Sequence, residues 1–127
     1  MTDCENLPNR IELPRGRHGV RMPVIYVYPN GSQSIHTITF NITDDGRVKE
    51  CFFAHDEQRD AKGGQLCELI EDGCKLLSRL LQYGDTVQQL ADYCGANCPE
   101  GTKEGPPSSI IGAIARAAVD LEQRAMA

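Results

Sequence analysis

Cysteine and histidine pairs offer the first candidate chemistry in this sequence. Three residues separate Cys94 from Cys98, and three separate Cys51 from His55. A structural zinc site needs four thiolate or imidazole ligands, and these four side chains are of the right types if their segments fold together. The C-x3-C spacing is looser than the common C-x2-C knuckle, so zinc is the weaker alternative to a metal-free domain. It also differs from the C-x-x-C of redox dithiols.

Enzymatic chemistry has little support in the sequence. There is no G-x-S-x-G, no H-E-x-x-H and no P-loop, and the three histidines lack motif context. His36 falls on the same strand face as Ile38, where a structural histidine is the simpler interpretation. Cys74 and Cys94 lie in apolar stripes, where free cysteine acts as a small hydrophobe. We expect no catalytic site.

Basic residues suggest anion binding instead. Guanidinium groups donate in a planar fork that suits phosphate, although a solvated arm is the alternative interpretation for the N-terminal arginines. Glycines before the first expected helix, and a Gly- and Pro-rich loop before the last, add free backbone N–H groups at helix starts. We expect a nucleotide-like anion or a protein partner to contact these residues: Arg10, Arg15, Arg17, Arg21, Lys62, Gly63, Gly64, Ser108 and Ser109.

The first half of the chain predicts three strands. VIYVY (24–28) is rich in β-branched and aromatic residues, IHTITFNIT (35–43) alternates apolar and polar residues, and VKECFFAH (48–55) follows. Asn30-Gly31 and Asp45-Gly46 are typical of tight hairpin turns. An antiparallel meander of three or more strands is expected.

The second half predicts helices. Apolar residues recur at steps of three and four from Leu66 to Leu81, again in a shorter segment from Val87 to Cys94, and again from Ile110 to Leu121. Gly84 and Gly95 end the first two segments, and Asp85 or Thr86 caps the second. Strands followed by two to three helices predict an α+β fold with the helices packed on one face of the sheet.

Size and charge limit the class of protein. The 127 residues suit one domain, which we place at 21–127 behind an extended basic arm at 1–20. A net charge of −5 argues against nucleic-acid binding, which needs a basic surface. Neither a secretory signal nor an apolar run long enough for a membrane is present, so we expect a cytoplasmic protein with reduced cysteines.

Several short motifs resemble one known family. The LPNR run (7–10), the DDGR turn (44–47), Lys62-Gly63, the LLQYG helix end (80–84) and AIARA (113–117) occur in the order and spacing of the TSCPD domain. That domain is known as the C-terminal region of adenosylcobalamin-dependent (class II) ribonucleotide reductases, and small stand-alone versions occur in bacteria and their phages. The resemblance covers about residues 7–120.

The chain departs from the family at the motif that names it. Where Thr-Ser-Cys-Pro-Asp would precede AIARA, this chain has Ser108-Ser109-Ile110-Ile111-Gly112, and Asn97-Cys98-Pro99-Glu100 is a similar stretch upstream. The reductase barrel, its radical cysteine and its cobalamin site are absent from these 127 residues. The resemblance therefore implies a link to nucleotide metabolism without reductase activity.

The expected function is a non-catalytic binding or regulatory domain without cofactor, with a homo-oligomer as one form. A phage or prophage inhibitor that sequesters a nucleotide signal or blocks a host protein is one alternative. A zinc-stabilised structural module is the other.

Overall fold

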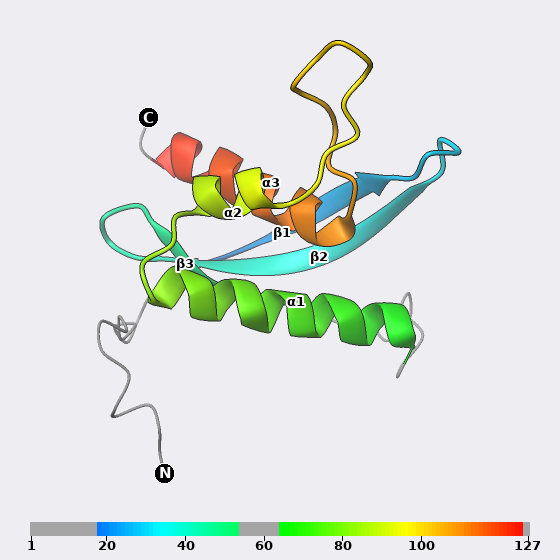
Figure 1. The fold of residues 1–127 in the computed structure, drawn as a ribbon. Coiled ribbons are helices and arrows are strands. Elements are labelled where there is room, and N and C mark those ends of the chain that lie inside the picture. Colours follow the sequence, from blue (N-terminus) through cyan, green and yellow to red (C-terminus); the bar gives the residue numbers. More distant parts are fainter. Residues whose placement is uncertain (1–17, 54–63, 126–127) are drawn as a thin grey trace.

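The computed structural model describes residues 18–53 and 64–125 (Figure 1). Three strands are followed by three helices, which confirms the α+β prediction. The elements are β1 (His18–Val27), β2 (Gln33–Ile42), β3 (Val48–Phe53), α1 (Gln65–Gln82), α2 (Val87–Tyr93) and α3 (Ile110–Ala125). Within these ranges, none of the helices has both the length and the apolar character needed to cross a membrane.

The sheet is the predicted antiparallel meander, with strand order β1-β2-β3. Gly31 and Gly46 adopt φ angles of 88° and 84°, which is the backbone conformation that the two hairpin turns require. Alternation along β2 places Ile38 and Phe40 fully inside the core, while Thr39 between them is partly exposed on the opposite face. One face of the sheet is therefore available to the helices.

Strand β1 includes the last three residues of the segment assigned to the extended arm at 1–20. β1 begins at His18, and its backbone pairing with β2 extends from His18 opposite Ile42 to Val27 opposite Gln33. Gly19 is part of this strand, where it lies opposite Asn41 of β2. Residues 1–17 lie outside the described residues.

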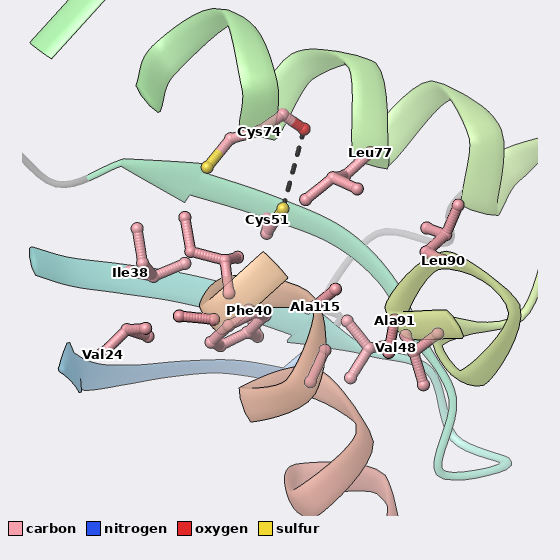
Figure 2. Close-up of a cluster of buried hydrophobic side chains, with 14 of the residues drawn as sticks. Val24, Ile38, Phe40, Val48, Cys51, Cys74, Leu77, Leu90, Ala91 and Ala115 are labelled. Carbon is pink, nitrogen blue, oxygen red and sulfur yellow. Dashed lines mark hydrogen bonds between the residues drawn. The ribbon is translucent and has the colours of Figure 1, made fainter. Parts of the chain in front are cut away.

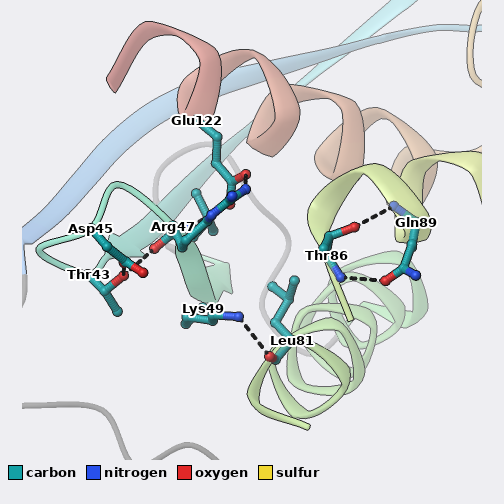
Figure 3. Close-up of polar contacts among 9 residues, drawn as sticks. Thr43, Asp45, Arg47, Lys49, Leu81, Thr86, Gln89 and Glu122 are labelled. Carbon is teal, nitrogen blue, oxygen red and sulfur yellow. Dashed lines mark hydrogen bonds and ion pairs between the residues drawn. The ribbon is translucent and has the colours of Figure 1, made fainter. Parts of the chain in front are cut away.

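Helix α1 covers the free edge of β3. The Ser78 hydroxyl accepts a hydrogen bond from the Cys51 N–H at 2.9 Å and lies 3.1 Å from the Cys51 carbonyl oxygen, to which it donates. The Lys49 ammonium donates to the Leu81 carbonyl at 3.4 Å (Figure 3). The unpaired backbone groups of an open strand edge can pair with a strand of another chain. Here the Ser78 side chain of α1 forms hydrogen bonds with the backbone N–H and carbonyl of Cys51.

The core lies between the sheet and all three helices (Figure 2). Ile70, Cys74 and Leu77 of α1 meet Phe40 and Cys51 of the sheet there. Cys67 of α1 is also buried. By contrast, four leucines of the predicted stripe or beside it are exposed: Leu66, Leu69, Leu76 and Leu80.

The ends of the helices follow the sequence signals. Gly84, with φ of 112°, follows the end of α1. Thr86 caps α2 in a reciprocal capping box with Gln89, as Figure 3 shows. The Ser109 hydroxyl accepts a hydrogen bond from the Gly112 N–H at 3.0 Å at the start of α3.

Glu122 of α3 ties that helix to the sheet. Its carboxylate is 7% exposed and accepts hydrogen bonds from the Val48 N–H at 2.8 Å and from Arg47 at 3.3 Å. A buried carboxylate is costly without such partners. In the sequence, Glu122 follows Leu121 at the end of the last apolar stripe, and the pattern does not predict its contact with Val48.

Candidate functional site

A cleft lies between α2, α3 and the loop that joins them. Its volume is about 590 Å³, which falls in the range of small-molecule sites. Residues from all three segments form its walls: Gln88, Ala91, Asp92, Cys94, Ala96, Lys103, Glu104, Gly105, Arg116, Val119 and Asp120.

The loop at 95–109 forms one wall and has an ordered base. Asn97 donates its N–H to the Pro106 carbonyl at 2.8 Å, and Ser108 donates to the Gly95 carbonyl at 2.9 Å. Gly105 packs so closely on Asn97 that a Cβ there would lie 2.1 Å from the Asn97 carbonyl oxygen. Figure 1 shows the rest of this loop projecting away from the sheet.

Arg116 connects the loop to α3. Its guanidinium donates to the Gly105 carbonyl at 2.6 Å, and the side chain is partly buried. It forms no ion pair within the described parts of the chain. Because arginine has five N–H donors, donors remain for a ligand after this contact.

The charges around the cleft are mixed. Lys103 and Arg116 supply two cations, while Asp92, Glu104 and Asp120 supply three carboxylates. The cations suit a phosphate or a carboxylate, and the carboxylates accept hydrogen bonds from hydroxyl and amino groups. The cleft thus fits a ligand that carries both an anionic group and several donors better than it fits a simple anion.

Cys94 brings a thiol to the cleft wall. Partial burial raises the pKa of this thiol, and the nearby Arg116 charge offsets only part of that effect. A raised pKa reduces the thiolate fraction at neutral pH, which makes Cys94 a weak nucleophile. Cys94 therefore forms part of the cleft wall and is a poor candidate for a nucleophile.

Two other thiols lie in the core. The Cys51 thiol lies 3.6 Å from the Cys74 carbonyl oxygen, to which it donates (Figure 2). The neighbouring Cys74 thiol and burial raise the pKa of Cys51 far above its usual value. Core filling was the prediction for Cys74, and its 1% exposure confirms it.

The three described residues of the zinc alternative lie in different parts of the fold. Cys51 is in the core, Cys94 is in the cleft wall and Cys98 is exposed on the loop, while His55 is outside the described residues. Among the residues that are described, no three His, Cys, Asp or Glu side chains form a group that could hold a metal ion.

Of the residues predicted to bind an anion, those that the structure describes lie at separate places. Arg21 is exposed on β1, Gly64 is the N-cap of α1, and Ser109 uses its hydroxyl to cap α3. The Ser108 carbonyl accepts a hydrogen bond from the Tyr26 hydroxyl at 3.1 Å. The remaining predicted residues lie outside the described residues: Arg10, Arg15, Arg17, Lys62 and Gly63.

Sequence reasoning did not select Lys103 or Arg116 as single residues, although Lys103 lies in the Gly- and Pro-rich loop that it named. Both lie close in the sequence to Ser108 and Ser109, which were selected for their place before a helix. Arg116 interrupts an apolar helix within AIARA, and a charged residue beside an apolar stripe is a usable signal. Its approach to Gly105 depends on the path of the loop, which the sequence pattern does not specify.

Comparison with known proteins identifies one family. The family model described as the TSCPD domain matches residues 17–119 of this chain. No curated protein and no solved structure matches this chain.

Proposed function

Because this chain belongs to the TSCPD domain family, we propose that it is a non-catalytic binding domain related to nucleotide metabolism. Its ligand is a nucleotide-like small molecule with at least one phosphate, held in the cleft between α2 and α3. The observation that carries this proposal is the meeting of Lys103 and Arg116 at one cleft from separate segments.

The chemistry of a nucleotide matches the mixed charges of the cleft. Arg116 and Lys103 would contact the phosphate, since charge-assisted hydrogen bonds to phosphate are strong. Asp92, Glu104 and Asp120 would accept hydrogen bonds from sugar hydroxyl and base amino groups. A ligand lacking either part would leave one set of charges without partners.

Binding without turnover agrees with the groups in the cleft. The thiol there, Cys94, has a raised pKa, and His36 lies in β2, outside the cleft, with its Nε2 2.9 Å from the Ser34 hydroxyl. Catalysis by a nucleophile needs an activating base within hydrogen-bond reach. We therefore expect the ligand to be held unchanged, as in a regulator or a sequestering protein.

Calorimetric titration with AMP, ATP and adenosine tests this function. Wild-type protein should bind the two nucleotides and bind adenosine far more weakly. The Lys103→Ala change should weaken nucleotide binding by about tenfold, as expected for one charged contact.

Lys75→Ala is the matched control, because this lysine is exposed on α1 away from the cleft. It should leave the affinity within about twofold of wild type. Equal binding of adenosine and ATP, or equal losses in the two lysine variants, would contradict the proposal.

A further inference from the structure

Four leucines on α1 are exposed in a regular pattern. Leu66, Leu69, Leu76 and Leu80 are 46%, 55%, 63% and 45% exposed. Together with Gly73 they follow one another at steps of three, four, three and four residues, which is the spacing of a seam between two helices. These five positions are called the leucine seam below. Exposed apolar surface of this kind marks an interaction site.

The leucine seam lies beside the face that α1 turns to its own sheet. Ile70, Cys74 and Leu81 form that buried face. At Gly73 the two faces meet, because a Cβ there would lie 2.1 Å from Cδ1 of Ile111 on α3. Ile111 thus fills the space above the glycine and adds an apolar side chain beside the seam.

Polar side chains, two of them charged, border the seam on one flank. Gln65, Asp72 and Arg79 follow one another at seven-residue steps on the exposed flank. On the other flank, Ile70 and Leu77 are buried in the core. A helix that packs on the seam therefore meets one acidic and one basic side chain along a single line.

We propose that the leucine seam binds a second copy of this chain, with the two α1 helices antiparallel. A two-fold interface must be self-complementary, because each patch meets its own copy. When Leu69 faces Leu80 of the second copy, Asp72 falls beside Arg79 of that copy, and the symmetry repeats both contacts. This pairing goes beyond the ligand binding proposed above and uses different residues.

Charge favours the antiparallel direction over the parallel one. In a parallel pair, Asp72 would approach Leu77 of the second copy, and Leu77 is already buried in its own core. In the antiparallel pair, Gly73 and Ile111 also face Leu76, the most exposed of the four leucines. The seam thus offers both apolar and charged contacts to its own copy.

Sedimentation velocity over a range of protein concentrations tests the proposal. Wild-type protein should form a dimer whose population rises with concentration. Leu76→Asp should weaken dimerisation by at least about a hundredfold, because the carboxylate would be buried without a partner. Circular dichroism should show an intact fold, since Leu76 is 63% exposed in the monomer.

Charge reversal tests the register. Asp72→Arg and Arg79→Asp should each weaken the dimer by about tenfold, because each change replaces two symmetric attractions with repulsions. The double variant should return to within about threefold of wild type. Glu68→Lys combined with Lys75→Glu is the control, because both residues are exposed on α1 outside the seam.

Each result either supports or overturns the pairing. A wild-type monomer at every concentration would overturn it and would assign the seam to another protein or to another segment of the chain. A dimer that survives Leu76→Asp would place the interface elsewhere. A double charge variant that fails to recover, with the control unaffected, would overturn the antiparallel register.

Discussion

Single polar side chains hold the helices of this protein to its sheet. Ser78 and Glu122 lie on different helices, yet both satisfy backbone groups of β3. Their partners lie 27 and 74 residues away along the chain. Because buried polar groups are expensive to leave unpaired, these two residues determine where α1 and α3 sit on the strand.

Replacing Glu122 tests this anchoring. Glu122→Ala leaves the Val48 N–H without its acceptor, so the free energy of unfolding should fall by about 1–3 kcal/mol. Arg47→Ala removes only the exposed side of the ion pair, since the Arg47 side chain is 46% exposed, and should cost less than about 1 kcal/mol. Urea denaturation measures both values. Equal losses of stability in the two variants would show that the ion pair with Arg47, rather than the contact with the Val48 N–H, stabilises the fold.

Cys94 provides a titration test of the cleft. Burial raises its pKa, so alkylation in folded protein should reach its half-maximal rate at a higher pH than in urea-unfolded protein. The raised pKa favours the neutral thiol, so its contribution to stability is present at low pH and is lost as pH rises through the folded value. Peptide mapping of the modified protein measures the rate. Identical pH profiles would contradict a buried thiol.

At the scale of elements, β3 is an edge strand that contacts helix α1. Among the described residues it pairs with β2 alone, and α1 lies along its other side. The Ser78 hydroxyl contacts both the N–H and the carbonyl of Cys51, in the way that a neighbouring strand would. This contact fixes α1 along the sheet and turns the leucine seam outward.

Removing the Ser78 hydroxyl should therefore weaken the edge. Ser78→Ala should lower the free energy of unfolding by about 1–3 kcal/mol, because two backbone groups lose a buried partner. Ser32→Ala is the control, since that hydroxyl contacts only the exposed Asn30 side chain. It should change stability by less than about 0.5 kcal/mol. Circular dichroism during urea unfolding separates the two outcomes, and similar losses would refute the edge contact.

Local sequence signals predicted the elements well. The alternating pattern predicted that Ile38 and Phe40 lie on the buried face of β2. Glycines predicted the turns at positions 31, 46 and 84, where the backbone adopts a positive φ. The leucines of α1 were less informative. Their spacing predicted a stripe, but it could not show which part of a wide stripe the sheet would cover.

On the scale of the whole molecule, the proposed ligand site and the proposed interface are separate. The cleft is lined by α2, α3 and their loop, and the leucine seam is on α1. Sequence patterns do not determine how such segments meet, which explains why Lys103 and Arg116 were not selected as single residues. Their meeting depends on the loop base, where Asn97 bonds to Pro106.

Titration of ¹⁵N-labelled protein with ATP, followed by amide chemical shifts, tests the central claim most directly. The account predicts saturable shifts at the cleft, centred on Cys94, Lys103, Gly105 and Arg116, with far smaller shifts on adding adenosine. Shifts that do not saturate at millimolar ATP, or that centre on Arg21 and the sheet, would contradict a nucleotide-binding cleft.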